Sequence, residues 1–316
     1  MTRYTERPWT KLYGQGLPTD ITPDYPTMLD MFNASVTRAP DSAAIKYFDG
    51  VLTMAGLDAR SDSLAVALAG SGFAAGDRLA VYVQNNPAFV IALLAAWKAG
   101  GAAVVINPMN RARELKYLLA DSGASALLCL DDLYESVAKE VIATGETAVR
   151  TVITCSPLDG QSRNDERLFA GVQRLRPEGT LDLEEIFSQN DGRRPVPVDP
   201  GSDDVAVLCY TSGTTGVPKG AMCTHGTMVF NSQTYRDWMG FTAEDSVLGV
   251  APLFHITGLI GHMGVALLAA CPLVINHRFD AGVVIDAIRE HRPTFTIGSM
   301  QIVVPSRSLT PVPGLP

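Results

Sequence analysis

Short apolar runs and longer segments with helical periodicity alternate along the chain. In the clearest unit, the apolar run Leu79–Val83 is followed by Asn86 and Pro87, a pair typical of a helix start. A helical pattern then covers Ala88–Ala99, a glycine pair ends it, and the apolar run Ala102–Ile106 follows. A helix between two strands at this spacing predicts a βαβ unit whose strands are parallel.

The same alternation continues on both sides of this unit. Further helices are predicted at 27–39, 55–69, 111–122, 133–143, 226–238 and 281–291, and further strands at 43–48, 126–130, 149–154, 205–209, 221–224, 246–250 and 294–297. This order predicts an α/β fold with mixed, mostly parallel sheets and helices on both faces. Residues 156–204, rich in charges and prolines, are predicted to be a surface connection with one short helix near 181–187.

The apolar segment 256–275 is about long enough to cross a bilayer, which requires roughly 20 apolar residues. Pro272 and the glycines at 258, 261 and 264 interrupt it. We therefore expect a buried helix followed by a strand, and no membrane span.

Composition narrows the class of protein. With 47% apolar and 18% charged residues, the chain can bury a substantial core in one large or two ordinary domains. Its net charge of -8 argues against nucleic acid or an anionic membrane as the main partner, because both attract basic surfaces. The five cysteines form no CxxC pair, so we expect reduced core thiols and no zinc site. The N-terminus lacks an apolar signal region, which makes a cytoplasmic location the expectation.

Candidate chemistry is concentrated in Tyr210–Gly220, YTSGTTGVPKG. This stretch holds five hydroxyl side chains, three glycines and Lys219 between two apolar runs. Hydroxyls and closely approached backbone amides donate to anions, and a lysine adds positive charge, so the pattern predicts a phosphate-binding loop between two strands. It is not a Walker A loop, since Pro218 and Gly220 occupy positions where that motif requires glycine and a hydroxyl residue. A hydroxyl-rich surface turn is the alternative interpretation.

The stretch resembles the signature of the adenylate-forming enzymes, which include acyl-CoA synthetases, aryl-CoA ligases, luciferases and peptide-synthetase adenylation domains. Two further segments resemble motifs of the same family: WKAGGAAVVINP at 97–108, and APLFHITGL at 251–259, similar to the PLFH segment beside the acyl pocket of CoA ligases. The resemblance covers about residues 25–299.

This resemblance implies a partial N-terminal adenylate-forming domain over residues 1–300. It implies an ATP-dependent acid–CoA ligase, which adenylates a carboxylate and then forms a thioester, with a fatty acid as the expected substrate. ATP and CoA would be co-substrates and Mg²⁺ the cofactor. An aryl-CoA ligase or a peptide-synthetase adenylation domain is the alternative enzyme, although the PLFH segment favours a CoA ligase.

The resemblance also implies roles for individual residues. Thr211 would contact Mg²⁺, and Lys219 would neutralise phosphate charge. The β and γ phosphates would be held by Ser212, Gly213, Thr214, Thr215 and Gly216. His255 would lie where ATP and the acyl carboxylate meet, and Leu259 matches a position that gates the acyl tunnel in some fatty-acyl members. Three of these residues also have a structural interpretation: Lys219 as a solvated lysine, His255 as a histidine satisfied within the fold, and Leu259 as a core leucine. We interpret His225 and His262 as structural.

After Ser299 the sequence departs from the family. Residues 301–316 form a proline-rich, atypical tail, and neither the glutamate motif that binds magnesium nor a C-terminal lid domain follows. We therefore expect this polypeptide not to complete the ligase reaction by itself. Two alternatives are a non-catalytic remnant and a half-enzyme or assembly module that needs a complementing chain or a homodimer.

Overall fold

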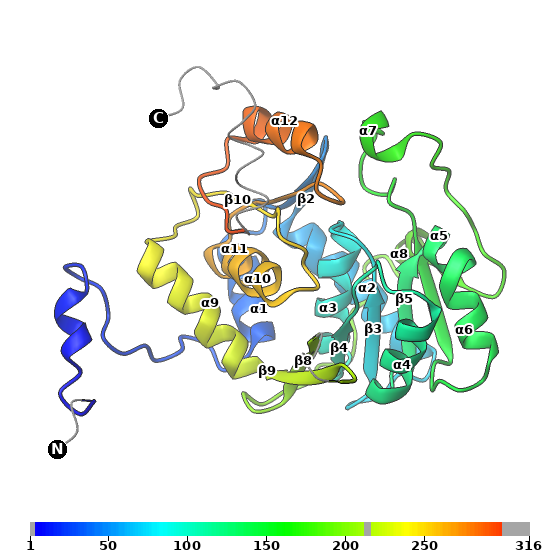
Figure 1. Cartoon of the computed structure of the whole chain (residues 1–316), viewed down its shortest axis with the longest axis horizontal. Coiled ribbons are helices and arrows are strands. Elements are labelled where there is room, and N and C mark those ends of the chain that lie inside the picture. Colours follow the sequence, from blue (N-terminus) through cyan, green and yellow to red (C-terminus); the bar gives the residue numbers. More distant parts are fainter. Residues whose placement is uncertain (1–3, 212–215, 299–316) are drawn as a thin grey trace.

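The protein contains two β-sheets with helices between and around them, as seen in a computed structural model that describes residues 4–211 and 216–298 (Figure 1). The larger sheet has seven strands in the order β7-β6-β5-β3-β4-β8-β9. All neighbouring pairs are parallel except β8 and β9, which are antiparallel. Its strands are β3 (Arg78–Tyr82), β4 (Ala102–Val105), β5 (Ala126–Leu130), β6 (Thr151–Cys155), β7 (Leu181–Asp182), β8 (Val205–Thr211) and β9 (Lys219–Thr224).

The smaller sheet has the order β10-β11-β1-β2. Its strands are β1 (Ala43–Tyr47), β2 (Gly50–Thr53), β10 (Val247–Leu248) and β11 (Leu273–Ile275). β1 and β2 are antiparallel, and the other neighbours are parallel. The predicted fold class, α/β with mixed and mostly parallel sheets, is confirmed.

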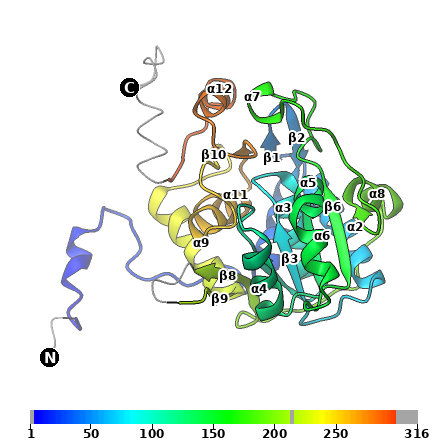
Figure 2. The same ribbon diagram turned by 45° about the vertical axis from the view of Figure 1, so that its right-hand side comes forward.

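Helices cover both faces of the larger sheet. The α-helices of the described residues, of which α12 packs on the smaller sheet, are α1 (Met28–Arg38), α2 (Met54–Gly70), α3 (Pro87–Lys98), α4 (Ala112–Ser122), α5 (Asp131–Leu133), α6 (Lys139–Ala143), α7 (Glu166–Phe169), α8 (Leu183–Gln189), α9 (His225–Met239), α10 (Ile256–Gly258), α11 (Val265–Ala269) and α12 (Ala281–His291). π-Helical segments join α5 to α6 (Tyr134–Ala138) and α10 to α11 (Leu259–Gly264), and a 3₁₀ turn covers Pro8–Leu12. In both ribbon views the segment with this turn stands away from the rest of the molecule (Figures 1 and 2).

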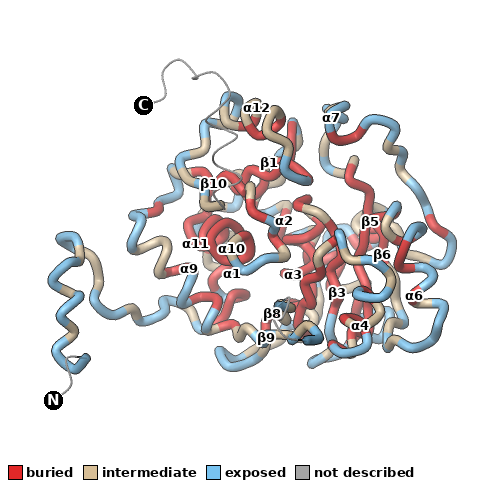
Figure 3. The backbone as a smooth tube through the Cα atoms, viewed as in Figure 1, coloured by how far each residue is buried: buried red, intermediate tan, exposed pale blue. Residues whose placement is uncertain are grey.

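The core lies between the two sheets, where α3 packs on β3 and β4 and α2 packs on β1 and β2. α3 is buried along its whole length, which explains why its sequence is apolar on all sides (Figure 3). Its start is the one predicted, because Asn86 caps the helix by accepting a hydrogen bond from the Phe89 amide. A second apolar cluster forms where α4 and the 134–141 segment cover the other face of the sheet.

Three predictions of secondary structure need correction. The chain at 50–53, where no strand was predicted, forms β2 against β1. At 294–297 the expected strand is reduced to a single bridge between Phe295 and Val247. The 156–204 connection is not confined to the surface, because it adds β7 to the sheet edge and buries Phe169 and Ile186. The bridge at Phe295 and strand β7 depend on distant parts of the chain, which local periodicity does not report, whereas β2 pairs with the adjacent β1.

The apolar segment 256–275 forms the expected buried helical stretch, followed by β11. Across the two described ranges, no helix is long and apolar enough to cross a membrane.

Candidate functional site

The predicted strand–loop–strand arrangement is present, because β8 and β9 form an antiparallel hairpin around the candidate phosphate loop. Thr211 lies opposite Lys219 at the loop end of the hairpin, and both side chains are exposed, as is Gly216. Four predicted site residues lie outside the described residues, namely Ser212, Gly213, Thr214 and Thr215. No carboxylate among the described residues pairs with Lys219, so its charge is available to a ligand.

Tyr210 anchors the hairpin to α4. Its hydroxyl donates to Asp121 Oδ2 at 2.6 Å, and burial raises the pKa of Tyr210 above its ordinary value. Its ring lies over Gly220 on the neighbouring strand, where a Cβ atom would come within 3.1 Å of the ring. Glycine at 220 therefore lets the tyrosine ring pack flat against β9. The Tyr117 hydroxyl donates to the Pro218 carbonyl at 3.0 Å and ties the end of the loop to the same helix.

A cavity of about 660 Å³ lies at the carboxyl ends of β4 and β8. Both Thr211 and His255 line it, so the structure brings these two predicted site residues together although 44 positions separate them in sequence. Cys209, Ala221 and Cys223 form its hairpin wall. Crevices at the carboxyl ends of parallel strands are the usual ligand sites of open α/β sheets.

His255 lies at the rim of this cavity, at the start of α10. Its Nδ1 accepts from the Thr257 amide at 3.4 Å, so the neutral ring carries its proton on Nε2. The turn before it is tight. A Cβ atom on Gly258 would lie 2.2 Å from the Pro252 carbonyl oxygen, which explains the glycine in HITG. His255 is exposed, and its side chain caps the start of α10.

Asn85 is a positioning residue that the sequence interpretation missed. It is buried at the carboxyl end of β3, where its Oδ1 accepts from the Leu253 amide at 2.8 Å. Its Nδ2 donates to the Gly249 and Ala251 carbonyls at 3.2 and 3.0 Å. One side chain thus joins the larger sheet to the segment that carries His255. The only signal in the sequence was a second asparagine beside the capping Asn86.

The other predicted residues are core residues. Leu259 is completely buried and does not line the cavity. His225 and His262 are buried, and burial lowers the pKa of each to about 4. All five cysteines are free, but Cys209 and Cys223 are only half-buried and line the cavity, which corrects their interpretation as core thiols.

The residues around Thr211 fit a magnesium ion that is held mainly by phosphate oxygens. No group of three or more His, Cys, Asp or Glu side chains within residues 4–211 and 216–298 is arranged to hold a metal. Glu114 lines the cavity, but its Oε2 accepts from the Arg111 amide. Mg²⁺ commonly takes one or two protein ligands and completes its shell with phosphate and water, and Thr211 offers one such oxygen.

Fold and cavity together define an α/β protein with a ligand site at the carboxyl end of a parallel sheet. A family model described as AMP-binding enzyme matches residues 32–305, and the chain belongs to that family. A long-chain-fatty-acid–CoA ligase of Bacillus subtilis strain 168 is 29% identical over 311 residues, covering 95% of this chain and 55% of the relative. A feruloyl-CoA synthase of an Amycolatopsis species is 32% identical over 260 residues, covering 82% of this chain and 46% of the relative.

The same fold is found in solved structures. A long-chain-fatty-acid–CoA ligase from Archaeoglobus fulgidus superposes with a TM-score of 0.73 at 24% identity, over 90% of this chain and 53% of that one. The chain therefore spans about half the length of the relatives it matches.

Proposed function

We propose that this chain forms the phosphate- and acyl-binding part of an ATP-dependent acid–CoA ligase. In that reaction a carboxylate attacks the α-phosphate of ATP, pyrophosphate leaves, and the acyl group then passes from AMP to the thiol of CoA. The observation that carries the proposal is the shared cavity: Thr211, on the candidate phosphate hairpin, and His255, in the PLFH segment, line the same space. Membership of the AMP-binding enzyme family supports it.

In this proposal Thr211 contributes an oxygen to Mg²⁺, and Lys219 neutralises phosphate charge from the opposite strand. Preorganised donors and a metal ion directed at developing charge are the usual means of stabilising nucleotidyl transfer. His255 presents Nε2–H to the region where nucleotide and carboxylate meet, because Nδ1 is held by the Thr257 amide.

The proposed acid is a fatty acid. Apolar side chains at the cavity wall, including Val105, Leu118 and Ile256, favour an apolar acyl group. The match to the Bacillus long-chain ligase supports the alkyl assignment. An aryl acid is the second candidate, supported by the feruloyl-CoA synthase match and by Phe254 at the same wall.

Calorimetry with MgATP tests the phosphate assignment on Lys219→Ala. A charge-assisted phosphate contact contributes about 1.5 to 3 kcal/mol, so we expect roughly ten- to hundredfold weaker binding. The matched control is Lys139→Ala, since Lys139 is an exposed lysine paired with Glu135 and does not line the cavity. Equal affinity of wild type and Lys219→Ala would exclude Lys219 from the phosphate site.

We further propose that the 316-residue polypeptide binds MgATP but does not complete the ligase reaction by itself. The chain covers about half of its relatives, and catalysis needs nucleotide, acid and thiol to be positioned together with water excluded. Pyrophosphate release with MgATP, CoA and either a fatty or an aryl acid measures this. Robust turnover by the chain alone would refute the proposal, and turnover only after a second chain is added would identify a half-enzyme.

A further inference from the structure

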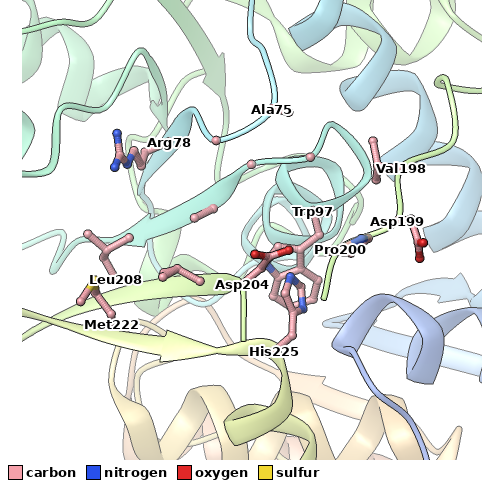
Figure 4. A pocket seen from close by; sticks show the side chains of 15 residues that line it. Ala75, Arg78, Trp97, Val198, Asp199, Pro200, Asp204, Leu208, Met222 and His225 are labelled. Carbon is pink, nitrogen blue, oxygen red and sulfur yellow. The ribbon is translucent and has the colours of Figure 1, made fainter. Parts of the chain in front are cut away.

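A second cavity, of about 600 Å³, opens at the opposite end of the larger sheet (Figure 4). It lies at the amino ends of β3, β4 and β8, where Arg78, Ala102 and Val205 line it. None of the residues proposed above for ATP, Mg²⁺ or the acyl group contributes to it. Its volume falls in the range of roughly 300 to 1,000 Å³ that is typical of small-molecule sites.

Two buried rings form the floor of this cavity. Trp97 and His225 meet edge to face with their centroids 5.4 Å apart (Figure 4). The indole Nε1 donates to the Ala206 carbonyl at 2.9 Å, which fixes the tryptophan in place.

His225 contributes a buried hydrogen-bond donor. Its Nδ1 accepts from the Met28 amide at 3.3 Å, so the neutral ring carries its proton on Nε2. Burial lowers the pKa of His225 to about 4, which keeps the ring neutral near pH 7. The ring is 2% exposed, and no acceptor for Nε2–H is found within residues 4–211 and 216–298. His225 lines the cavity, so a ligand that supplies a carbonyl oxygen would give this donor an acceptor.

The charge at this end of the cavity is negative. Asp199 and Asp204 line its rim, with Asp204 beside the two rings (Figure 4), and neither forms an ion pair with a basic residue in the described part of the chain. The C-terminus of α3 reaches the same end, because Trp97, Gly100 and Gly101 line the cavity. A helix C-terminus carries partial negative charge and favours a cation. Arg78 lies at the other side, away from Asp204 and His225 (Figure 4).

The hairpin supplies an apolar wall to the same cavity. Leu208 and Met222 face each other across β8 and β9 and line it, and the Met222 side chain is 72% exposed. Val198 adds a third apolar side chain. The cavity thus combines apolar walls, an acidic rim and one buried donor.

We propose that this cavity is a second ligand site, for a small apolar amine that also carries a carbonyl group. The ammonium group is attracted by the acidic rim that Asp199 and Asp204 form, the apolar body packs against Leu208 and Met222, and the carbonyl oxygen accepts from His225 Nε2–H. The site is separate from the proposed ATP site, and its test requires no nucleotide.

Phenylalaninamide is the probe, because it joins an ammonium group, a carbonyl and an apolar ring. Calorimetry on the full chain, without MgATP, is expected to show saturable binding at millimolar concentration or below. 3-Phenylpropanamide, which keeps the ring and the carbonyl but lacks the ammonium group, is expected to bind roughly tenfold more weakly, since two carboxylates lose their partner.

Variants locate the binding. Asp199→Asn with Asp204→Asn keeps the polar shape of the rim, including the acceptor for the Gly201 amide, and should weaken phenylalaninamide binding about tenfold. Asp203→Asn is the matched control, because Asp203 is an exposed neighbour that does not line the cavity. Met222→Lys, at an exposed position where folding is not at risk, adds a competing cation and should abolish binding.

Three results would overturn the proposal: no saturable binding of phenylalaninamide up to about 10 mM, far above a useful small-molecule affinity; equal binding of 3-phenylpropanamide; or unchanged affinity in the double asparagine variant. Saturable binding that the double asparagine variant and Met222→Lys both weaken, with Asp203→Asn unchanged, would support it.

Discussion

A buried cluster of four charges offers the most demanding test of how this fold is stabilised. Lys98 Nζ lies 2.6 Å from Asp58 Oδ1 and 2.7 Å from Asp62 Oδ1. Arg194 Nη1 lies 2.9 Å from Asp58 Oδ2 and 2.8 Å from Asp62 Oδ2. The Lys98 and Asp62 side chains are 7% and 3% exposed, whereas Arg194 is 70% exposed. Two cations thus balance two carboxylates, and Lys98 is the buried cation.

Replacing Lys98 with Met keeps the volume of the side chain but leaves two buried carboxylates with one solvent-exposed partner. Removing one member of a buried ion pair costs about 3 to 5 kcal/mol, because the remaining charge stays desolvated. At roughly 2 to 3 °C per kcal/mol for a large domain, the apparent melting temperature should fall by about 6 to 15 °C. Arg194→Met should cost no more than about 1 kcal/mol, as is typical of exposed pairs.

The pairwise argument is tested by a second substitution. Adding Asp62→Asn to Lys98→Met restores the charge balance, so the double variant should be more stable than Lys98→Met alone. Thermal unfolding at one scan rate, followed by circular dichroism, measures all five proteins: the wild type, the single variants Lys98→Met, Arg194→Met and Asp62→Asn, and the double variant. If the double variant is less stable than Lys98→Met by the full cost of Asp62→Asn alone, the two sites are independent and the charge-balance reasoning is wrong.

Two further predictions concern the link between the sheets and the buried histidines. Asn85→Ala removes three hydrogen bonds to the 249–253 segment and should lower the free energy of unfolding by about 3 kcal/mol, measured by denaturant unfolding. Asn231→Ala, at an exposed helix position, is the control and should change the free energy of unfolding by less than about 0.5 kcal/mol. Equal effects of the two substitutions would show that Asn85 does not hold this segment. Burial lowers the pKa of His225, His262 and His277 to about 4, below the ordinary 6.5, so the unfolded chain binds protons that the folded chain does not. Stability should therefore be complete above about pH 6.5 and fall by about 1.4 kcal/mol per pH unit per histidine as pH drops toward 4.5. The pKa of Asp49 is lowered to about 2, so this carboxylate affects stability only below the pH range of the histidines. Unfolding is measured from pH 7.5 to 4.5, and a constant stability over this range would contradict the assignment of buried neutral imidazoles.

Local signals predicted the parts of the fold that local interactions determine. α3 was predicted because Asn86 caps it and its neighbours are apolar, and the β8–β9 hairpin because two apolar runs flank a turn-rich stretch. β2 and β7 were missed because each is short; β7 is also stabilised by a strand that is distant in sequence, β6.

The candidate site shows the same division. The chemistry of Thr211 and Lys219 was evident from their neighbours, but nothing in the spacing places Thr211 and His255 on one cavity. That proximity was expected only from the family resemblance. Asn85 was not predicted because its role depends on three backbone groups at 249, 251 and 253. The amino-end cavity was not predicted because its walls come from distant parts of the chain.

The β8–β9 hairpin contributes side chains to both cavities. Cys209 and Ala221 face the carboxyl-end cavity, while the next pair, Leu208 and Met222, faces the amino-end cavity. A substitution at Leu208 or Met222 therefore changes the lining of the amino-end cavity, and one at Cys209 or Ala221 changes that of the carboxyl-end cavity. Inserting or deleting a single residue in β8 has a different outcome, since every side chain beyond that point moves to the opposite face. The hairpin should therefore tolerate changes of residue type at 208 or 222 far better than any change in the number of residues between 205 and 211.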